Sequence, residues 1–208
     1  MNSLSYTHRY EPATQPGSPP LLLLHGTGGN ETDLLPIGRQ IAPGAALLSP
    51  RGDVNENGMP RFFRRLAEGV FDQKEVAQRT QALADFLAAA ATRYGFNAGQ
   101  LNALGYSNGA NIAASLLLLR PETLAGAVLL RPMVVLDPAS LPNLQGKRIA
   151  ILSGRHDPIV PVEHPEKLAA TFRQAGAKVD LHWLETGHQL TAEDFRVAGQ
   201  FLSAPVRG

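Results

Sequence analysis

Short apolar runs alternate with longer segments of helical periodicity along most of the chain. Runs of about four to eight apolar residues are typical of buried strands, and strands that alternate with helices are typical of a parallel sheet covered on both faces. The pattern therefore predicts an α/β fold with a mostly parallel sheet. The expected strands lie at residues 21–24, 45–49, 101–106, 127–130, 148–152 and 179–184.

Two segments between these runs carry clear helical signals. Asp72 and Glu75 suit the N-cap and N3 positions of an amphipathic helix whose apolar residues recur at helical spacing until Gly95 can end it. Residues 110–119 begin with alanines and continue into leucines before Pro121, so this helix should be buried on most sides.

The remaining long segments have weaker patterns. Residues 5–20 suit one or two edge strands, because their prolines would interrupt a central strand. Residues 51–71 form the longest stretch without a clear period, and such long connections tend to be functional or disordered. Met59, Phe62 and Phe63 lie in this stretch, and a disordered loop rarely contains such large apolar side chains.

Length and composition limit the classes of protein to consider. The 208 residues predict a single domain over residues 1–208, and a chain that is 44% hydrophobic and 18% charged has the profile of a compact globular enzyme. The formal net charge of +1 argues against nucleic acid or anionic membrane as partners.

Residue types that are missing narrow the chemistry. The sequence has no cysteine, which excludes disulfides, thiolate metal sites and a cysteine nucleophile. The amino terminus has neither a basic region nor the apolar region of a signal peptide, and no apolar run approaches the roughly 20 residues of a membrane helix. We therefore expect a cytoplasmic protein without membrane insertion.

The pentapeptide at residues 105–109, Gly-Tyr-Ser-Asn-Gly, lies between an expected strand and an expected helix. A serine flanked at two residues' distance by glycines in this context is typical of a nucleophile elbow, a sharp turn that lifts the serine hydroxyl clear of the sheet. A β-carbon at either glycine would collide with the neighbouring strand or helix. The motif therefore predicts that Ser107 is a nucleophile.

A glycine-rich loop follows the first apolar strand, at His25-Gly26-Thr27-Gly28-Gly29. Such glycines commonly make no more than a tight turn, but together with a nucleophile elbow they predict half of an oxyanion hole. The two backbone amides that these motifs nominate are those of Thr27 and Asn108. His25 is expected to brace the loop.

A serine hydroxyl needs a base, and the base needs an acid that fixes its tautomer. In this architecture the acid and the histidine follow the serine, on loops after late strands. Asp157, in a proline-flanked turn, and His188, before the last helix, fit that order. The weaker alternatives are Asp137, Asp180 and Glu185 as the acid, and His156 and His182 as the base.

This chemistry requires neither metal nor cofactor, and the histidines lack the spacing of metal ligands. We therefore expect no cofactor and no metal, with a small-molecule ester as the binding partner. A homodimer is left open.

The combined motifs resemble those of the α/β-hydrolase superfamily, and most closely the bacterial phospholipase/carboxylesterase family, which is related to acyl-protein thioesterases. The likeness extends from about residue 20 to 202. The residues that carry it are Leu-Leu-His-Gly-Thr-Gly-Gly-Asn-Glu at 23–31, Asp-Leu-Leu-Pro at 33–36, Gly-Tyr-Ser-Asn-Gly-Ala-Asn at 105–111, and the Asp157 and Gly-His-Gln-Leu motifs.

The resemblance implies an α/β-hydrolase fold and a serine esterase with Ser107, Asp157 and His188 as its triad. Many relatives insert a cap domain before the acid strand, but the stretch from Arg131 to Gln145 is too short for one, so no cap domain is expected. It also implies that residues 50–52 and 59–63 line the substrate cleft, with Met59, Phe62 and Phe63 as substrate-binding residues. The second segment replaces a tryptophan-bearing segment of the thioesterase branch, which favours small aryl or short acyl esters over long acyl chains.

Three alternatives stay open at this point. Phe62 and Phe63 would serve equally well as core anchors for a long loop. Arg61, Arg64 and Arg65 form either a solvated face or a grip on a carboxylate. The same fold would also suit a thioesterase or lysophospholipase-like acyl hydrolase, perhydrolysis, or a binding protein without catalysis.

Overall fold

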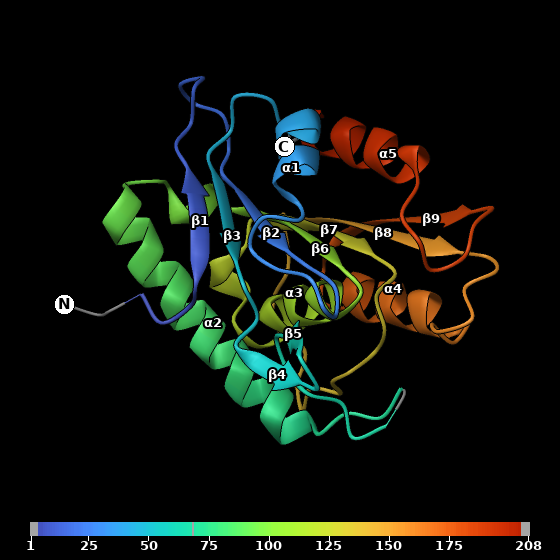
Figure 1. The fold of residues 1–208 in the computed structure, drawn as a ribbon. Coiled ribbons are helices and arrows are strands. Elements are labelled where there is room, and N and C mark those ends of the chain that lie inside the picture. The colour runs from blue at the N-terminus through green and yellow to red at the C-terminus, as the bar shows by residue number, and fades with distance from the viewer. Residues whose placement is uncertain (1–3, 68, 205–208) are drawn as a thin grey trace.

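The computed structural model describes residues 4–67 and 69–204 and contains a seven-stranded sheet in the order β1-β3-β2-β6-β7-β8-β9 (Figure 1). Strand β1 pairs antiparallel with β3, and every other pair in this sheet is parallel. Its strands are β1 His8–Glu11, β2 Leu21–Leu24, β3 Leu47–Pro50, β6 Asn102–Tyr106, β7 Gly126–Leu130, β8 Arg148–Gly154 and β9 Lys178–Leu184. The predicted α/β fold with a mostly parallel sheet is confirmed.

Helices cover both faces of the sheet, and each face has its own core (Figure 1). Helices α2, α3 and α4 lie on one face, and α1 and α5 lie together on the other. Their bounds are α1 Leu35–Ile41, α2 Gln73–Tyr94, α3 Asn108–Leu119, α4 His164–Gln174 and α5 Ala192–Ser203, with short 3₁₀ helices η1 Ala98–Gln100 and η2 Pro121–Thr123. Residues 131–147, between β7 and β8, contain neither helix nor strand, so no cap domain is inserted there.

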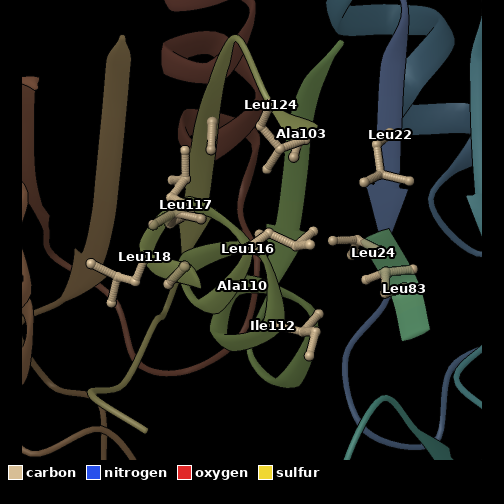
Figure 2. Packing of buried hydrophobic residues seen from close by; sticks show 14 of the residues in the cluster. Leu22, Leu24, Leu83, Ala103, Ala110, Ile112, Leu116, Leu117, Leu118 and Leu124 are labelled. Atoms are coloured by element: carbon tan, nitrogen blue, oxygen red, sulfur yellow. The ribbon is translucent and has the colours of Figure 1, made fainter. Parts of the chain in front are cut away.

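Helix α3 is the most deeply buried helix, as its alanine- and leucine-rich sequence predicts. Every residue from Asn108 to Leu118 is buried. Figure 2 shows Leu116 and Leu117 of α3 among apolar side chains that include Leu24 of β2 and Ala103 of β6. Burial of these side chains fixes α3 against the strands that carry the glycine-rich loop and the serine.

The structure confirms the predicted cap residues at both ends of α2, but not the predicted role of Glu75. Asp72 caps the helix, because its carboxylate accepts from the amides of Lys74 and Glu75, and Gly95 ends it in the left-handed conformation with φ 73°. Glu75 does not complete a capping box. Its carboxylate instead pairs with Arg64 and Arg79.

Residues 51–71 contain an element that the periodicity missed, a two-stranded hairpin of β4 Val54–Glu56 and β5 Met59–Arg61. Its turn carries Asn57 and Gly58 with positive φ, which is the turn chemistry of a tight hairpin. The two strands have only three residues each, so they are too short for an alternating pattern to stand out. Among the described residues, no helix combines the length and apolar character needed to cross a membrane.

Candidate active site

Ser107 lies on the turn between β6 and α3, with φ 52° and ψ −115°. The left-handed φ is strained for a residue with a side chain. The surrounding packing leaves no room for larger neighbours: a β-carbon at Gly105 would lie 2.5 Å from the carbonyl oxygen of Gly109, and one at Gly109 would lie 2.0 Å from that of Leu24. The predicted elbow is therefore present, and the steric reason for its glycines is confirmed.

Gly109→Ala should therefore destabilise the protein. The new methyl group would meet backbone atoms of Leu24 and His25, which cannot rotate away as a side chain can, so we expect a loss of about 2–3 kcal/mol in the free energy of unfolding. Urea titration measures it. Gly199→Ala is the matched control, because its β-carbon would meet its nearest neighbour at 3.7 Å, an ordinary contact, and alanine favours a helix. Equal stability of the two variants would contradict the steric account.

The structure brings Ser107, His188 and Asp157 into one hydrogen-bonded chain. Nε2 of His188 lies 3.0 Å from Oγ of Ser107, and Nδ1 lies 2.8 Å from Oδ2 of Asp157. Because an ionised carboxylate only accepts hydrogen bonds, Nδ1 carries the proton and Nε2 is free to accept from the serine hydroxyl. The three segments are far apart in sequence and meet at the carboxyl ends of β6, β8 and β9.

Asp157 is held by its own turn. Its Oδ1 accepts from the amides of Ile159 at 2.8 Å and Val160 at 3.1 Å, and its side chain is 2% exposed. The second carboxylate oxygen is thereby directed at His188. The β8 end packs tightly against the histidine loop, since a β-carbon at Gly154 would lie 2.3 Å from the carbonyl oxygen of Gly187.

The two amides nominated for the oxyanion hole belong to residues that border the same cavity as Ser107. Neither Thr27 N nor Asn108 N donates to an acceptor within the described residues. The neighbouring amides are used: Gly28 N donates to Pro60 O at 3.0 Å, and Gly29 N donates to Gly26 O at 3.0 Å. The assignment of the oxyanion hole stays a prediction.

His25 braces the glycine-rich loop, as its position predicts. Its Nδ1 lies 2.7 Å from the carbonyl oxygen of Gly26, so it donates there, and Nε2 accepts from the amide of Gly52 at 2.9 Å. Protonation of Nε2 would remove the acceptor of the Gly52 amide. Burial lowers the pKa of His25, outweighing the opposing effects of the Gly26 hydrogen bond and of the nearby Asp33 and Glu31 carboxylates.

This depressed pKa predicts that acid destabilises the loop. Below the ordinary pKa of about 6.5, unfolded chains bind a proton at this position that the folded protein resists, so stability is lost as the pH falls. We expect the free energy of unfolding, measured in urea at pH 7.5 and at pH 5.5, to drop less for His25→Asn than for the wild type. His156→Asn, at an exposed side chain, should keep the wild-type drop. An unchanged drop in His25→Asn would refute the assignment.

The cavity beside Ser107 has a volume of about 260 Å³. Its apolar walls are formed by Phe71, Met133 and Ile159. The other lining residues are Thr27, Arg61, Arg65, Gly69, Tyr106, Asn108, Asn111 and His188.

The expectation that Phe62 and Phe63 line the cleft is corrected by the structure. Both are buried in the core, at 1% and 0% exposure. The side chain of Asn108 fixes their backbone, because its Oδ1 accepts from Phe62 N at 2.7 Å. The two phenylalanines are therefore anchors of the long loop, and Phe71 and Tyr106 are the residues with a six-membered aromatic ring that line the cavity. Met59 is 37% exposed beside Gly28, and its substrate role stays a prediction.

The segment at residues 50–52 is not part of the cavity lining either. The guanidinium of Arg51 pairs with Glu31 at 2.5 Å, and Gly52 donates to His25. A β-carbon at Gly52 would lie 2.3 Å from the backbone of Arg61. This segment therefore supports the glycine-rich loop and the hairpin from behind.

A buried ion pair that sequence reasoning missed holds the histidine loop. Arg131 and Asp194 are both 0% exposed in their side chains and bond through two parallel contacts of 2.7 and 2.9 Å. Arg131 also donates to the carbonyl oxygens of Gly187 and Gln189, each at 3.0 Å. Since these residues flank His188, one guanidinium anchors both sides of the proposed base. Tyr106 adds a third contact, from its hydroxyl to His188 O at 3.2 Å.

The alternative acids and bases lie elsewhere. Glu185 and His156 form an exposed pair with each other, and Asp180 and His182 lie within β9. The carboxylate that contacts His188 is that of Asp157. Among the residues that the structure describes, His, Asp and Glu side chains form no group of three or more that could hold a metal ion. That the chemistry needs no cofactor stays a prediction.

A mostly parallel sheet with helices on both faces and a serine on a strained strand-to-helix turn define an α/β-hydrolase. The sequence model of the phospholipase/carboxylesterase family matches residues 8–205. The chain belongs to this family and is an esterase-type hydrolase.

Proteins of similar sequence and structure agree with this assignment. The chain is 49% identical over 199 residues to the putative hydrolase MhqD of Bacillus subtilis (strain 168), covering 96% of this chain and 98% of that protein. The crystal structure of the Bacillus cereus carboxylesterase is similar with a TM-score of 0.93 at 47% identity, covering 95% of this chain and 93% of that one. The carboxylesterase from Mesorhizobium loti has a TM-score of 0.92 at 36% identity, with 99% and 98% coverage.

Proposed function

We propose that this protein hydrolyses small acyl or aryl carboxylic esters through an acyl-serine intermediate. The observation that carries the proposal is the chain of hydrogen bonds from Ser107 through His188 to Asp157 at the edge of a small cavity. Family membership supports the ester class of substrate. The serine mechanism and the substrate size are inferred from the site.

In the proposed acylation step, Oγ of Ser107 attacks the ester carbonyl carbon while its proton moves to Nε2 of His188. Asp157 stabilises the imidazolium that forms. The carbonyl oxygen gains the negative charge, and the amides of Thr27 and Asn108 are the donors that would stabilise it. When the tetrahedral intermediate collapses, the bond to the alcohol oxygen breaks and His188 returns the proton to the leaving alcohol.

Deacylation repeats these steps with water as the nucleophile. Water loses a proton to Nε2 of His188 and attacks the acyl carbon, and the Ser107–acyl bond breaks as the proton returns to Oγ. The carboxylic acid leaves and the free serine is restored. Every proton transfer in this cycle uses one nitrogen, which is why the histidine loop has to be held firmly.

The cavity volume supports small substrates. At about 260 Å³ it lies below the usual range of sites for drug-sized ligands and suits one aromatic ring or a short acyl chain. This favours small esters over a lysophospholipid. A thioester with an equally small acyl group would fit the same space, so thioester hydrolysis is the alternative within this proposal.

The test is a series of p-nitrophenyl esters from acetate to octanoate, together with matched thioesters of the same acyl groups. We expect kcat/KM to be highest for short chains and higher for oxygen esters than for thioesters. Mass spectrometry after reaction with a fluorophosphonate should place the label on Ser107. Labelling at another residue, or a rate that rises steadily to octanoate, would overturn the proposal.

A further inference from the structure

The structure separates the three arginines of the 61–65 segment. Arg61 and Arg65 line the cavity that contains Ser107. The guanidinium of Arg64 instead pairs with Glu75 of α2 at 3.0 Å, and its side chain is 60% exposed. Arg64 therefore belongs to a solvated surface, whereas the other two place positive charge beside the reacting serine.

Arg61 and Arg65 share one carboxylate, that of Glu56 in β4. Nε of Arg61 lies 3.2 Å from Oε2 of Glu56, and Nε of Arg65 lies 2.7 Å from Oε1. Burial favours the neutral acid, but the hydrogen bonds from Arg65 and the charges of both arginines outweigh it and lower the pKa of Glu56. Two guanidinium groups and one ionised carboxylate leave an excess positive charge.

Among the residues that the structure describes, the other charges near the cavity do not cancel this excess. No aspartate or glutamate accompanies Arg61 and Arg65 among the described lining residues. Asp157 is 2% exposed and directed at His188, and Glu75 faces Arg64 and Arg79.

Both guanidinium groups also keep unused donors. Arg61 donates through Nε to Phe63 O and through Nη1 to Oγ1 of Thr27, and Arg65 donates through Nε to Glu56. Among the described residues, Nη2 of Arg61 and both Nη atoms of Arg65 have no hydrogen-bond partner. Planar pairs of such donors suit a carboxylate.

We propose that Arg61 and Arg65 form a carboxylate-binding subsite in this cavity, so that the preferred esters carry a carboxylate in addition to the ester bond. This inference rests on the proposed ester hydrolysis at Ser107. Arg61 is buried and fixed by Thr27 and the loop backbone, so it sets the position of the charge. Arg65, whose side chain is 36% exposed, provides the accessible donors.

The kinetic test compares pairs of esters in which a free carboxylate of one member is replaced by its uncharged methyl ester in the other. Monophenyl adipate and methyl phenyl adipate share their phenol leaving group, but only the first has an anionic acyl chain. 4-Acetoxybenzoate and methyl 4-acetoxybenzoate place the same difference on the alcohol side. The quantity measured is kcat/KM for the anionic member of each pair relative to the neutral member.

Arg65→Gln should lower kcat/KM for the anionic ester of at least one pair about tenfold, chiefly through KM, as expected for the loss of a charge-assisted hydrogen bond. The neutral partner should change less than about twofold. Arg64→Gln is the matched control and should change neither ester, and Arg65→Lys, which keeps the charge, should restore much of the preference. Added salt should reduce the rate with the anionic ester alone.

Equal losses for the anionic and neutral esters, or none in either pair, would overturn the subsite. Binding provides a measurement that does not depend on catalysis: calorimetry with Ser107→Ala should detect monophenyl adipate, and the added Arg65→Gln change should weaken that binding about tenfold. Failure of the wild type on every ester, with this binding intact, would refute the proposed hydrolysis and leave the carboxylate subsite supported. Absent binding would refute the subsite itself.

Discussion

Replacing Ser107 with alanine is expected to lower kcat for p-nitrophenyl acetate by about a millionfold, the loss seen when a serine hydrolase loses its nucleophile. The reason is chemical, because without Oγ no acyl-serine bond can form and His188 has no hydroxyl to deprotonate. The fold should be little affected: the elbow is shaped by Gly105 and Gly109, which the substitution leaves in place. Steady-state release of p-nitrophenolate and urea unfolding measure the two effects separately.

Ser115→Ala is the matched control for this variant. Ser115 lies in α3, the helix that follows Ser107, and is buried, and its hydroxyl donates to the carbonyl oxygen of Asn111 one turn earlier. Its loss removes a hydroxyl from α3 without touching the triad. We expect nearly unchanged kcat. Activity of Ser107→Ala within about tenfold of the wild type would mean that another residue is the nucleophile.

The nucleophile, base and acid candidates were accessible from sequence because each lies in a short local pattern. The glycines around Ser107 are needed because a single sharp turn leaves no room for a β-carbon at their positions. The turn that contains Asp157 directly follows a buried strand. Since the carboxyl ends of parallel strands meet on one side of a sheet, the order of strands was enough to bring residues 107, 157 and 188 together.

Contacts between residues far apart in the chain could not be predicted from the sequence where neither residue lies in a local pattern. Nothing around Arg131 or Asp194 indicates that they form a buried pair. Arg131 is a single charged residue after an apolar run, and Asp194 lies beside Glu193 and close to Arg196, like an ordinary residue of a charged helix surface. The same limit applies to Phe62 and Phe63. Their apolar character predicted burial and substrate contact equally well, and only the exposed fractions of their side chains and the hydrogen bond from Phe62 N to Asn108 decide for burial.

The buried pair of Arg131 and Asp194 is interpreted as a device that positions His188. Arg131 adopts φ 55°, a strained value for a residue other than glycine, and in this conformation its side chain reaches Leu152 O, Gly187 O and Gln189 O in addition to Asp194. Burial of a charged pair contributes little net stability by itself. The main effect of the pair is on geometry, because Arg131, at the end of β7, holds the carbonyl groups on both sides of His188.

Arg131→Met is expected to cost about 3–5 kcal/mol in the free energy of unfolding, because it leaves the buried charge of Asp194 without the guanidinium that compensates it. In the double variant Arg131→Met/Asp194→Asn the charge is gone, and the asparagine oxygen can still accept from the amide of Thr191 as Asp194 does. Much of the stability should therefore return. Urea titration of the wild type, the single variant and the double variant measures this recovery.

Activity should not recover with stability in that double variant. The carbonyl groups of Gly187 and Gln189 still lack their donor, so His188 is held less firmly against Ser107, and a displacement of about 1 Å in a catalytic group costs about a hundredfold in rate. We therefore expect kcat for p-nitrophenyl acetate about a hundredfold below that of the wild type, with KM little changed, in a protein that is folded at the assay temperature. Wild-type kcat in the folded double variant would show that the pair supports the fold alone, because a structural role ends once stability is restored, whereas a positioning role does not.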